Sequence, residues 1–395
     1  MTELLVRARQ LAPQLVEVRR DLHRYPELGF QEVRTAAVAA ERVAALGYRV
    51  RRGVGRTGVV AELGSGGPVV ALRADMDALP IQEESEQDYR STVAGVMHAC
   101  GHDAHVSMLL GAATLLAELA QRGELPAGTV RLLFQPSEEC SDAENKSGAM
   151  RMVDDGAMDG VGAVFGLHIG AHLPAGKAFL VQPGPVMAGT DTFTITVRGK
   201  SAHAARPNEG VDALVLAAHV VLAAQNVVAR RISPLDQGVV SIGQIQGGTA
   251  ENIVAESVTL RGTLRYFDPN VRDVLREELR RAVAVADALG GRGELDLRTG
   301  YPAVVNDPGA SELARTAIGK TLGPDAFGEL APWMGGEDFA VLQQQAPGCF
   351  FWLGAALTDA REHHHPRFDI DESVLPLGAG MLAACAVNAL RALSE

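Results

Sequence analysis

The stretch Met97-His-Ala-Cys-Gly-His-Asp-Ala-His105 places three histidines, a cysteine and an aspartate within nine positions. A thiolate at Cys100 and an imidazole at His102, two residues further on, can reach a common metal centre. Apolar residues follow His102 at helical spacing, which predicts that a helix begins there. Because a helix N-terminus favours negative charge, we expect Cys100 to ionise more easily than a free thiol. The alternative is a buried cysteine beside a surface cluster of histidines.

The overall composition is that of an ordinary globular protein. The composition, 47% hydrophobic and 21% charged, is ordinary for a soluble globular protein, and the length of 395 residues predicts about two domains with ample core in each. We expect no membrane span, because no apolar run has the length, and no secretory signal, because the N-terminus lacks that pattern. A net charge of −12 without a basic tract argues against nucleic acid as a partner. Cysteines at 100, 140, 349 and 385 lack a disulfide-like spacing, which predicts a reducing cytoplasm.

Helices and strands alternate through the first half of the chain. Apolar residues from Leu4 to Leu22 recur every three or four positions and predict one amphipathic first helix. A second helix over Val33–Leu46 would stop at Gly47. Strands are expected at residues 48–52, 58–63, 68–74, 129–135 and 163–168. This alternation predicts an α/β layer on a largely parallel sheet.

The pattern changes after Pro183-Gly-Pro185, where residues 191–198 alternate as a half-exposed strand does. The elements expected next are a helix over 211–231, strands over 238–246 and 257–266, a helix over 270–289 and a strand over 294–298. This β-α-β-β-α-β order is that of a small ferredoxin-like sandwich. A strand at 349–353 and a final helix at 375–393 then resume the first pattern. We therefore predict a discontinuous catalytic domain at 1–186 and 300–395, with an inserted domain at 187–299.

Metal-binding types of side chain stand at the ends of several predicted strands. They are Asp75 and Asp77, Glu138 and Glu139, and His168, with His363-His364-His365-Pro366 near the C-terminus. Each alone has an ordinary explanation, such as a solvated turn, a hydrogen-bonded core histidine or an exposed loop. In open α/β sheets, however, ligands collect beyond the carboxyl ends of strands, so these groups could converge in one crevice. The combined sulfur, nitrogen and oxygen set suits zinc, cobalt, nickel or manganese.

The chain resembles the cytoplasmic amidohydrolases grouped with hippurate hydrolase, aminoacylase and indole-acetyl-amino-acid hydrolase, which are relatives of the co-catalytic metallopeptidases. The resemblance runs almost from end to end. Its motifs are Arg20-Asp-Leu-His-Arg-Tyr-Pro-Glu-Leu-Gly-Phe30, Arg73-Ala-Asp-Met-Asp-Ala-Leu-Pro80, His98-Ala-Cys-Gly-His-Asp103, Phe134-Gln-Pro-Ser-Glu-Glu139, Gly199-Lys-Ser-Ala-His-Ala204 and Gly335-Gly-Glu-Asp-Phe339. So many motifs in order make coincidence an inadequate explanation.

The resemblance implies a site for two divalent ions, with zinc or manganese expected ahead of cobalt or nickel. Cys100 would bridge the ions, standing where peptidase relatives have an aspartate. The other implied ligands are His102, Glu139, His168 and His364, the last chosen over its neighbours because the family reads His-x-Pro. Glu138 would be the general base, which agrees with the chemical need for a carboxylate that moves a proton beside the metals.

Further residues take supporting roles by the same resemblance. Asp75 and Asp77 would support the ligands or bind metal weakly, and His105 would do the same or belong to the core. The inserted domain resembles the family's lid and dimerisation domain, and its His203 would stabilise the oxyanion. Asn252 and Arg265 would hold the substrate's carboxylate, although a lone strand arginine is also typical of a surface ion pair. A homodimer through this domain, or a dimer of dimers, is expected.

The sequence thus predicts a metal-dependent enzyme that cleaves N-acyl-L-amino acids to a carboxylic acid and a free amino acid. A dipeptidase, a carboxypeptidase or an N-acetyl-diaminopimelate deacetylase could use the same site. Two further alternatives are a binding protein that has lost catalysis and a thiol enzyme with Cys100 as nucleophile. Neither membrane nor nucleic acid is an expected partner.

Overall fold

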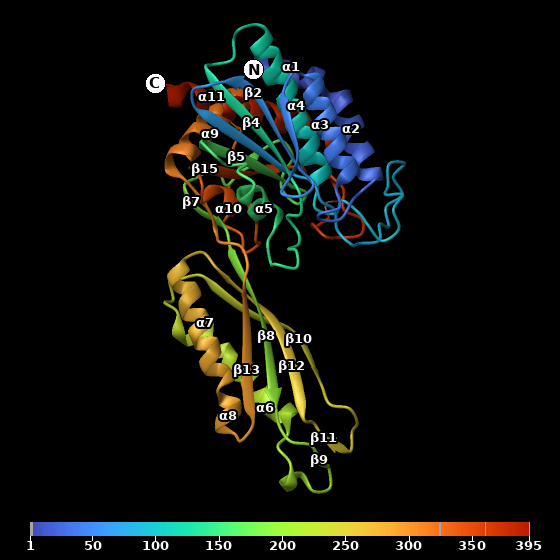
Figure 1. The fold of residues 1–395 in the computed structure, drawn as a ribbon, viewed down its shortest axis with the longest axis vertical. Coiled ribbons are helices and arrows are strands. Elements are labelled where there is room, and N and C mark those ends of the chain that lie inside the picture. Colours follow the sequence, from blue (N-terminus) through green and yellow to red (C-terminus); the bar gives the residue numbers. More distant parts are fainter. Residues whose placement is uncertain (1–2, 324, 360, 395) are drawn as a thin grey trace. The chain divides into compact units, whose positions relative to one another are not determined.

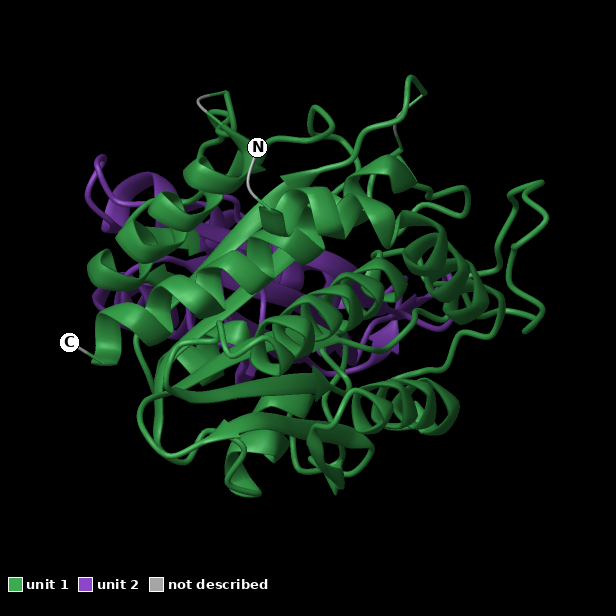
Figure 2. Ribbon diagram, turned by 90° about the horizontal axis from the view of Figure 1, so that it is seen from above, with its two compact units in different colours: residues 1–186, 305–332, 338–395 green, residues 187–304, 333–337 purple. Residues whose placement is uncertain are grey.

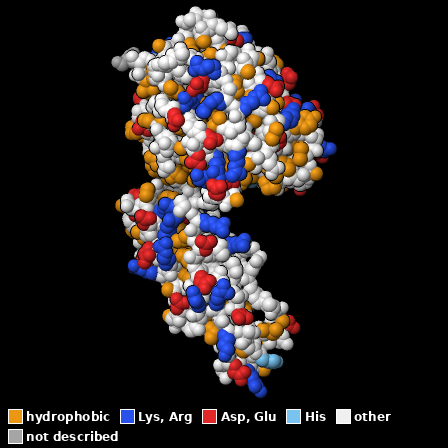
Figure 3. All heavy atoms as spheres, in the orientation of Figure 1, with side chains coloured by type: hydrophobic (Ala, Val, Ile, Leu, Met, Phe, Trp, Pro, Cys, Tyr) orange, Lys and Arg blue, Asp and Glu red, His pale blue; other side chains and the backbone are white. Residues whose placement is uncertain are grey.

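The computed structural model describes residues 3–323, 325–359 and 361–394, and its chain divides into two compact units. Unit 1 comprises Met1–Val186, Val305–Pro332 and Asp338–Glu395. Unit 2 comprises Met187–Val304 and Trp333–Glu337 (Figure 2). The sequence places the inserted domain at 187–299, and the role of unit 2 as a lid stays a prediction. On the face in view in Figure 3, acidic and basic side chains are interspersed over each unit.

A seven-stranded sheet organises unit 1 (Figure 1). Its strands, in spatial order, are β1 (Arg49–Val54), β2 (Gly58–Ser65), β4 (Gly128–Gln135), β3 (Val69–Asp75), β5 (Val161–Gly170), β15 (Gly348–Gly354) and β6 (Ala178–Phe179). The four central strands pair in parallel, and β1, β2 and β6 pair antiparallel at the edges. Two short strands, β7 (Gly184–Met187) and β14 (Val304–Asn306), lie where the chain passes between units. The prediction of an α/β layer on a largely parallel sheet is confirmed.

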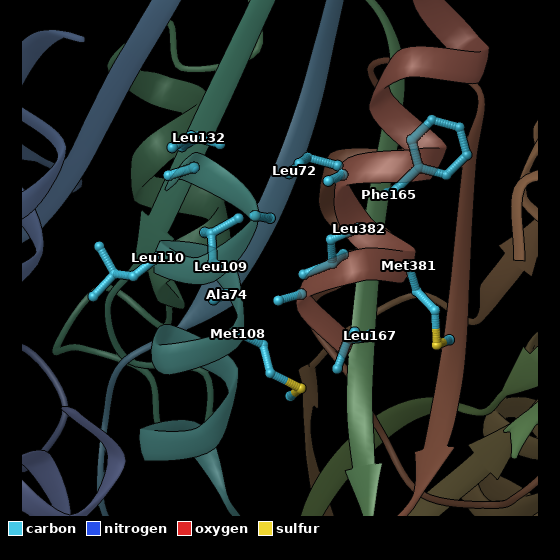
Figure 4. Close-up of a cluster of buried hydrophobic side chains, with 14 of the residues drawn as sticks. Leu72, Ala74, Met108, Leu109, Leu110, Leu132, Phe165, Leu167, Met381 and Leu382 are labelled. Carbon is cyan, nitrogen blue, oxygen red and sulfur yellow. The ribbon is translucent and has the colours of Figure 1, made fainter. Parts of the chain in front are cut away.

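The core of unit 1 lies between this sheet and two apolar helices. Its helices are α1 (Glu3–Gln10), α2 (Ala12–Arg24), α3 (Val33–Ala45), α4 (His102–Gln121), α5 (Gly148–Asp154), α9 (Pro308–Leu322), α10 (Phe339–Gln343) and α11 (Leu375–Ser394), with a 3₁₀ turn at Glu372–Val374. Helices α4 and α11 pack on each other and against β3 and β5. Leu109 and Leu382 meet Leu72 and Phe165 there (Figure 4). Burying each such side chain stabilises the fold by about 1.5–3 kcal/mol.

The first helix predicted over Leu4–Leu22 is two helices. Helix α1 ends at Gln10 and α2 begins at Ala12. Pro13 lies in the first turn of α2, where its missing N–H is tolerated, but it could not continue a helix from α1. The apolar face survives the break, because residues of both helices from Leu5 to Leu22 are buried on one side.

Three helical stretches have the length and composition to cross a membrane, which corrects the expectation that none does. They are His102–Gln121, Ala213–Arg231 and Glu372–Ser394. Scattered polar residues interrupt each of them, so none forms an unbroken apolar run in the sequence. The first and third are 78% and 83% buried inside the protein, whereas Ala213–Arg231 is only 33% buried.

Unit 2 is an antiparallel sheet with helices. It contains β8 (Gly189–Arg198), α6 (Ala213–Asn226), a π-helical turn (Val227–Arg231), β10 (Gly238–Gly247), β12 (Ser257–Tyr266), α7 (Pro269–Val283), α8 (Val285–Ala288) and β13 (Arg292–Thr299). The strand order is β10-β12-β8-β13, and β9 (Ala202–His203) pairs separately with β11 (Ile253–Val254). A 3₁₀ turn covers Pro207–Glu209. The predicted element order is present, except that the helix over 270–289 breaks at Ala284.

A buried carboxylate joins β8 to α7 within unit 2. Asp191 is fully buried and accepts hydrogen bonds from Arg272 at 2.9 Å and Arg276 at 2.7 Å. Burial raises the pKa of Asp191, but the two guanidinium groups lower it more, so its pKa is below the ordinary value. The stabilisation is therefore present at neutral pH and is lost as the pH falls through the folded-state pKa.

We expect Asp191→Asn to lower the free energy of unfolding at pH 7 by about 2–3 kcal/mol, because it leaves two arginines without their charge partner. The difference between variant and wild type should shrink as the pH falls below about 4, where the unfolded carboxyl also protonates. Urea unfolding at several pH values measures it. A difference that does not change with pH would show that Asp191 acts through packing alone.

Candidate metal centre

The polar residues at the carboxyl ends of three neighbouring strands lie at one edge of the unit 1 sheet. Asp75 is the last residue of β3, Glu138 and Glu139 follow β4, and His168 lies near the end of β5. These strands pair in parallel, so their carboxyl ends meet at the same edge. The convergence expected from the sequence is what the structure shows.

The five proposed ligands gather around Cys100. Donor atoms of Cys100, His102 and His168 lie within 4.8 Å of one another, and so do those of Cys100, Glu139 and His364. Cys100 is the member common to both groups. Its Sγ lies 3.5 Å from Nε2 of His168, and Nε2 of His364 lies 3.1 Å from Oε1 of Glu139. Glu138 forms a further group with His102 and Glu139.

A left-handed glycine places Cys100 and His102 beside each other. Gly101 has φ +88° and immediately precedes α4. A Cβ at this position would lie 2.4 Å from Cγ2 of Ile169, so a larger residue is excluded by both conformation and space. The chain therefore turns sharply between the thiol and the imidazole.

Asp77 holds two of the proposed ligands at once. Its Oδ1 lies 3.2 Å from Nδ1 of His102, and its Oδ2 accepts a hydrogen bond from the backbone N–H of Glu139 at 3.0 Å. A carboxylate on the far nitrogen of a histidine fixes the ring and leaves Nε2 for a metal. That Nε2 is buried and has no hydrogen-bond partner within the described part of the chain.

Asp75 and His105 form a second buried pair beside His102. Nδ1 of His105 lies 2.5 Å from Oδ1 of Asp75, and its Nε2 accepts the backbone N–H of Ile169 at 2.9 Å. Arg73 donates to the other oxygen of Asp75 at 2.7 Å. Burial raises the pKa of Asp75, but Arg73 and the neighbouring histidines lower it well below its usual range. Both nitrogens of His105 are thus engaged by the protein itself.

The charges around the site favour a cation. Burial lowers the pKa of His102, but the carboxylates led by Asp75 raise it to about 10. Burial, and then the carboxylates led by Glu139, raise the pKa of Cys100 well above that of a free thiol. The expectation that the helix N-terminus eases ionisation of Cys100 is therefore wrong for the metal-free protein, because desolvation and negative neighbours outweigh it. The donor set fits divalent ions, which replace the protons of such groups when they bind.

The histidine run contributes two side chains. His364, in a left-handed conformation with φ +64°, reaches Glu139 and is half-exposed. His363 is the residue that the sequence did not single out: it is partly buried, and its Nδ1 lies 3.8 Å from Sγ of Cys100. Burial and neighbouring histidines lower the pKa of His363 to about 3, so its ring is neutral. Only its place in the histidine run could have pointed to it.

Unit 2 carries His203, which is predicted to stabilise the oxyanion, and the two predicted substrate-binding residues Asn252 and Arg265. His203 is exposed in β9, and the backbone N–H of Ala204 donates to the carbonyl of Asn252 at 3.0 Å, so the two segments are neighbours. Strand β11 comes just before the Ser257 end of β12, whereas Arg265 lies next to its Tyr266 end. Arg265 is partly buried, its Nη1 donates to the carbonyl of Met334 at 2.7 Å, and burial lowers its pKa. The hydrogen bond of Arg265 is thus to a backbone carbonyl and not to an acidic side chain.

The fold and the thiol-centred donor set define a metal-dependent hydrolase. Residues 71–388 match the model of peptidase family M20/M25/M40, and the chain belongs to this family. It is 40% identical to IAA-amino acid hydrolase ILR1-like 2 of Arabidopsis thaliana, over 95% of this chain and 85% of the relative. It is 38% identical to thermostable carboxypeptidase 1 of Saccharolobus solfataricus, over 96% of each chain.

A solved structure supports the metal assignment. The YXEP protein of Bacillus subtilis, described as a dinuclear metal binding peptidase from the M20 family, superposes with a TM-score of 0.82. It is 35% identical, with 97% of this chain and 99% of that chain covered. The predictions of family, fold class and metal-dependent amidohydrolase activity are confirmed. Two divalent ions fit both this likeness and the two groups that share Cys100.

Proposed function

We propose that the protein hydrolyses N-acyl-L-amino acids to a carboxylic acid and a free amino acid, with zinc or manganese as the metal. The observation that carries this proposal is the division of labour between two adjacent glutamates. Glu139 lies in one group with Cys100 and His364, whereas Glu138 lies beside His102 and Glu139 without belonging to either group that contains the thiol. This arrangement supports Glu139 as a metal ligand and Glu138 as the group that moves protons.

The protein's own groups would carry the reaction as follows. Cys100, His102, Glu139, His168 and His364 would hold two divalent ions, which supply Lewis acidity toward the amide carbonyl when bound. Glu138 would take a proton from the attacking water and deliver it to the departing amine nitrogen. An N–H of His203 would donate to the oxyanion, while Asn252 and Arg265 would hold the substrate's carboxylate.

The arrangement of unit 2 supports a homodimer. His203 and Asn252 lie beyond the Ser257 end of β12. Arg265 lies eight residues further along that strand, so Ser257 and Arg265 are about 26 Å apart at the usual strand rise. One small substrate cannot contact both ends within one copy of unit 2. If both groups act on it, they come from two chains.

An exposed apolar surface on α6 is suited to such a contact. Leu214, Val215 and Leu222 are 45%, 53% and 65% exposed on a helix of high mean hydropathy. Strand β10 is an edge strand of the same unit. Apolar side chains grouped on one element are typical of a protein–protein interface. We propose that unit 2 is both the dimerisation and the lid domain.

The dimer predicts complementation between inactive variants. We expect His203→Ala and Cys100→Ala to be inactive alone, and to recover activity when mixed, unfolded and refolded together. One site of the mixed dimer would combine an intact metal centre with the partner's intact His203. The measurement is turnover after co-refolding, with each variant refolded alone as the control. Recovery no greater than the sum of the two controls would place His203 on its own chain's substrate or outside the reaction.

A substrate panel tests the function itself. The panel contains N-acetyl-, N-benzoyl- and indole-acetyl-amino acids beside plain dipeptides and N-acetyl-diaminopimelate, with protein loaded in turn with zinc, manganese and cobalt. Release of amino acid from acylated but not free-amine substrates is the expected result. The likeness to a carboxypeptidase favours peptide cleavage as the second candidate. Cleavage of dipeptides alone would establish that candidate instead.

A further inference from the structure

The turn that carries Glu138 and Glu139 has a strained backbone. Ser137 adopts φ +44°, which is a left-handed conformation that residues other than glycine rarely take. The residue comes directly before the two glutamates, so the direction of both side chains depends on this conformation. Something outside the turn has to hold it.

Glu32, which lies 105 residues earlier in the chain, contacts this turn directly. Its Oε1 accepts the backbone N–H of Ser137 at 2.8 Å, and the contact is buried. The same oxygen accepts the N–H of Phe30 at 3.0 Å, and Oε2 accepts the hydroxyl of Thr57. A single carboxylate thus joins the start of α3, the β1–β2 turn and the strained turn.

The side chain of Glu32 does not cap α3, the helix that follows it. Glu32 occupies the N-cap position of α3, yet its side chain makes no capping hydrogen bond there. Glu27 takes that role, because its two oxygens accept the N–H groups of Arg34 at 2.9 Å and Thr35 at 2.8 Å. The usual reason for a polar residue at an N-cap is therefore absent for Glu32.

Close packing holds the turn from two more sides. A Cβ at Gly29 would lie 2.5 Å from Oγ of Ser137 and 2.6 Å from Sγ of Cys140. On the other side, the N–H of Gly148 donates to the carbonyl of Ser137 at 2.9 Å, and a Cβ there would lie 1.5 Å from the carbonyl oxygen of Pro136. The segment containing Gly29 and Glu32 thus fits against the turn in shape as well as in hydrogen bonding.

We propose that Glu32 is a positioning residue that fixes the left-handed turn at Ser137 and so aims Glu139 at the metals and Glu138 at the attacking water. The proposal rests on the function proposed above for these two glutamates. Among the described residues, Glu32 belongs to none of the groups that could hold a metal ion. It acts through the backbone N–H of Ser137.

The first test removes the contact. We expect Glu32→Ala to weaken the binding of zinc and manganese by about 10–100-fold, the usual effect of losing a group that orients a ligand, and to lower kcat more than it raises KM. Glu32→Gln, which keeps one acceptor oxygen, should recover part of the metal affinity. The matched control is Glu27→Ala, which removes a partly buried carboxylate from the same motif. It should lower the melting temperature and leave metal affinity unchanged.

The second test asks whether the backbone conformation is what Glu32 controls. Glycine adopts positive φ without strain and alanine does not, while both replacements remove the Ser137 hydroxyl. In the Glu32→Ala background, Ser137→Gly should therefore restore metal affinity and kcat, and Ser137→Ala should not. Equal effects of glycine and alanine, or unchanged metal affinity in folded Glu32→Ala, would overturn the proposal.

Metal affinity separates this inference from the proposed function. If wild type hydrolyses no N-acyl-amino acid but Glu32→Ala still loses metal affinity and regains it with glycine at 137, the function is wrong and the positioning role stands. If wild type is active and the metal affinity of Glu32→Ala equals that of wild type, the proposed function stands and the positioning role of Glu32 is wrong.

Discussion

Glu138→Gln is expected to lower kcat by about 10²–10⁴-fold, the usual contribution of a positioned general base. The amide keeps the size of the side chain but cannot take a proton from water. Because Glu138 lies outside both groups that contain Cys100, the variant should bind the same amount of metal as wild type. Steady-state kinetics with metal analysis of the same sample measures both quantities.

The neighbouring residue supplies the contrast for this experiment. Glu139→Gln should lose metal as well as activity, because Glu139 contacts His364 and belongs to the group around the thiol. Excess metal should recover part of the activity of Glu139→Gln and none of that of Glu138→Gln. The same response to metal in both variants would mean that the two roles are exchanged or shared.

Removal of the metals is expected to abolish activity, and Cys100→Ala should have the same effect because both ligand groups contain its sulfur. Chelated wild type should regain activity with zinc or manganese, whereas Cys100→Ala should not. Metal at one hundred times its dissociation constant should also stabilise wild type by about 2.7 kcal/mol. Activity and melting temperature, before and after chelation, measure these effects.

The same experiment decides against the alternative that Cys100 is a nucleophile. A thiol enzyme would keep its activity in chelator and would be inactivated by thiol reagents. Persistence of activity after complete metal removal would contradict the metal-dependent mechanism. The raised pKa of Cys100 in the metal-free protein already disfavours attack by a free thiolate.

The sheet and most of the site could be predicted because strong local patterns specify them. Buried parallel strands appear as continuous apolar runs, and their carboxyl ends meet at one edge whatever the details of the loops. Asp75, Glu138, Glu139 and His168 follow such runs, so their convergence could be inferred from the sequence. The apolar spacing does not reveal the break between α1 and α2, because it continues across the break and only Pro13 marks the change.

Other features depend on contacts between distant residues and carry no local signal. Burial, and then the charges of Glu139, Glu138 and Asp75, raise the pKa of Cys100, and both effects arise only in the folded chain. Glu32 resembles a helix cap in the sequence, and its contact with Ser137 exists only in the tertiary structure. Likewise, the separation of His203 from Arg265 depends on β12, which runs between them in the folded unit.

The half-exposed His364 differs from the other four proposed ligands, which are buried or nearly so. Cys100 and His102 are anchored at the start of α4, and His168 is fixed within β5. His364 stands in a loop, in a left-handed conformation. A metal ion entering or leaving would therefore meet this side chain first, and the exchange rate would follow the opening of that loop. The loop residue His364 would then set the rate of metal exchange, whereas the ligands fixed on the rigid sheet and on α4 would set the metal affinity.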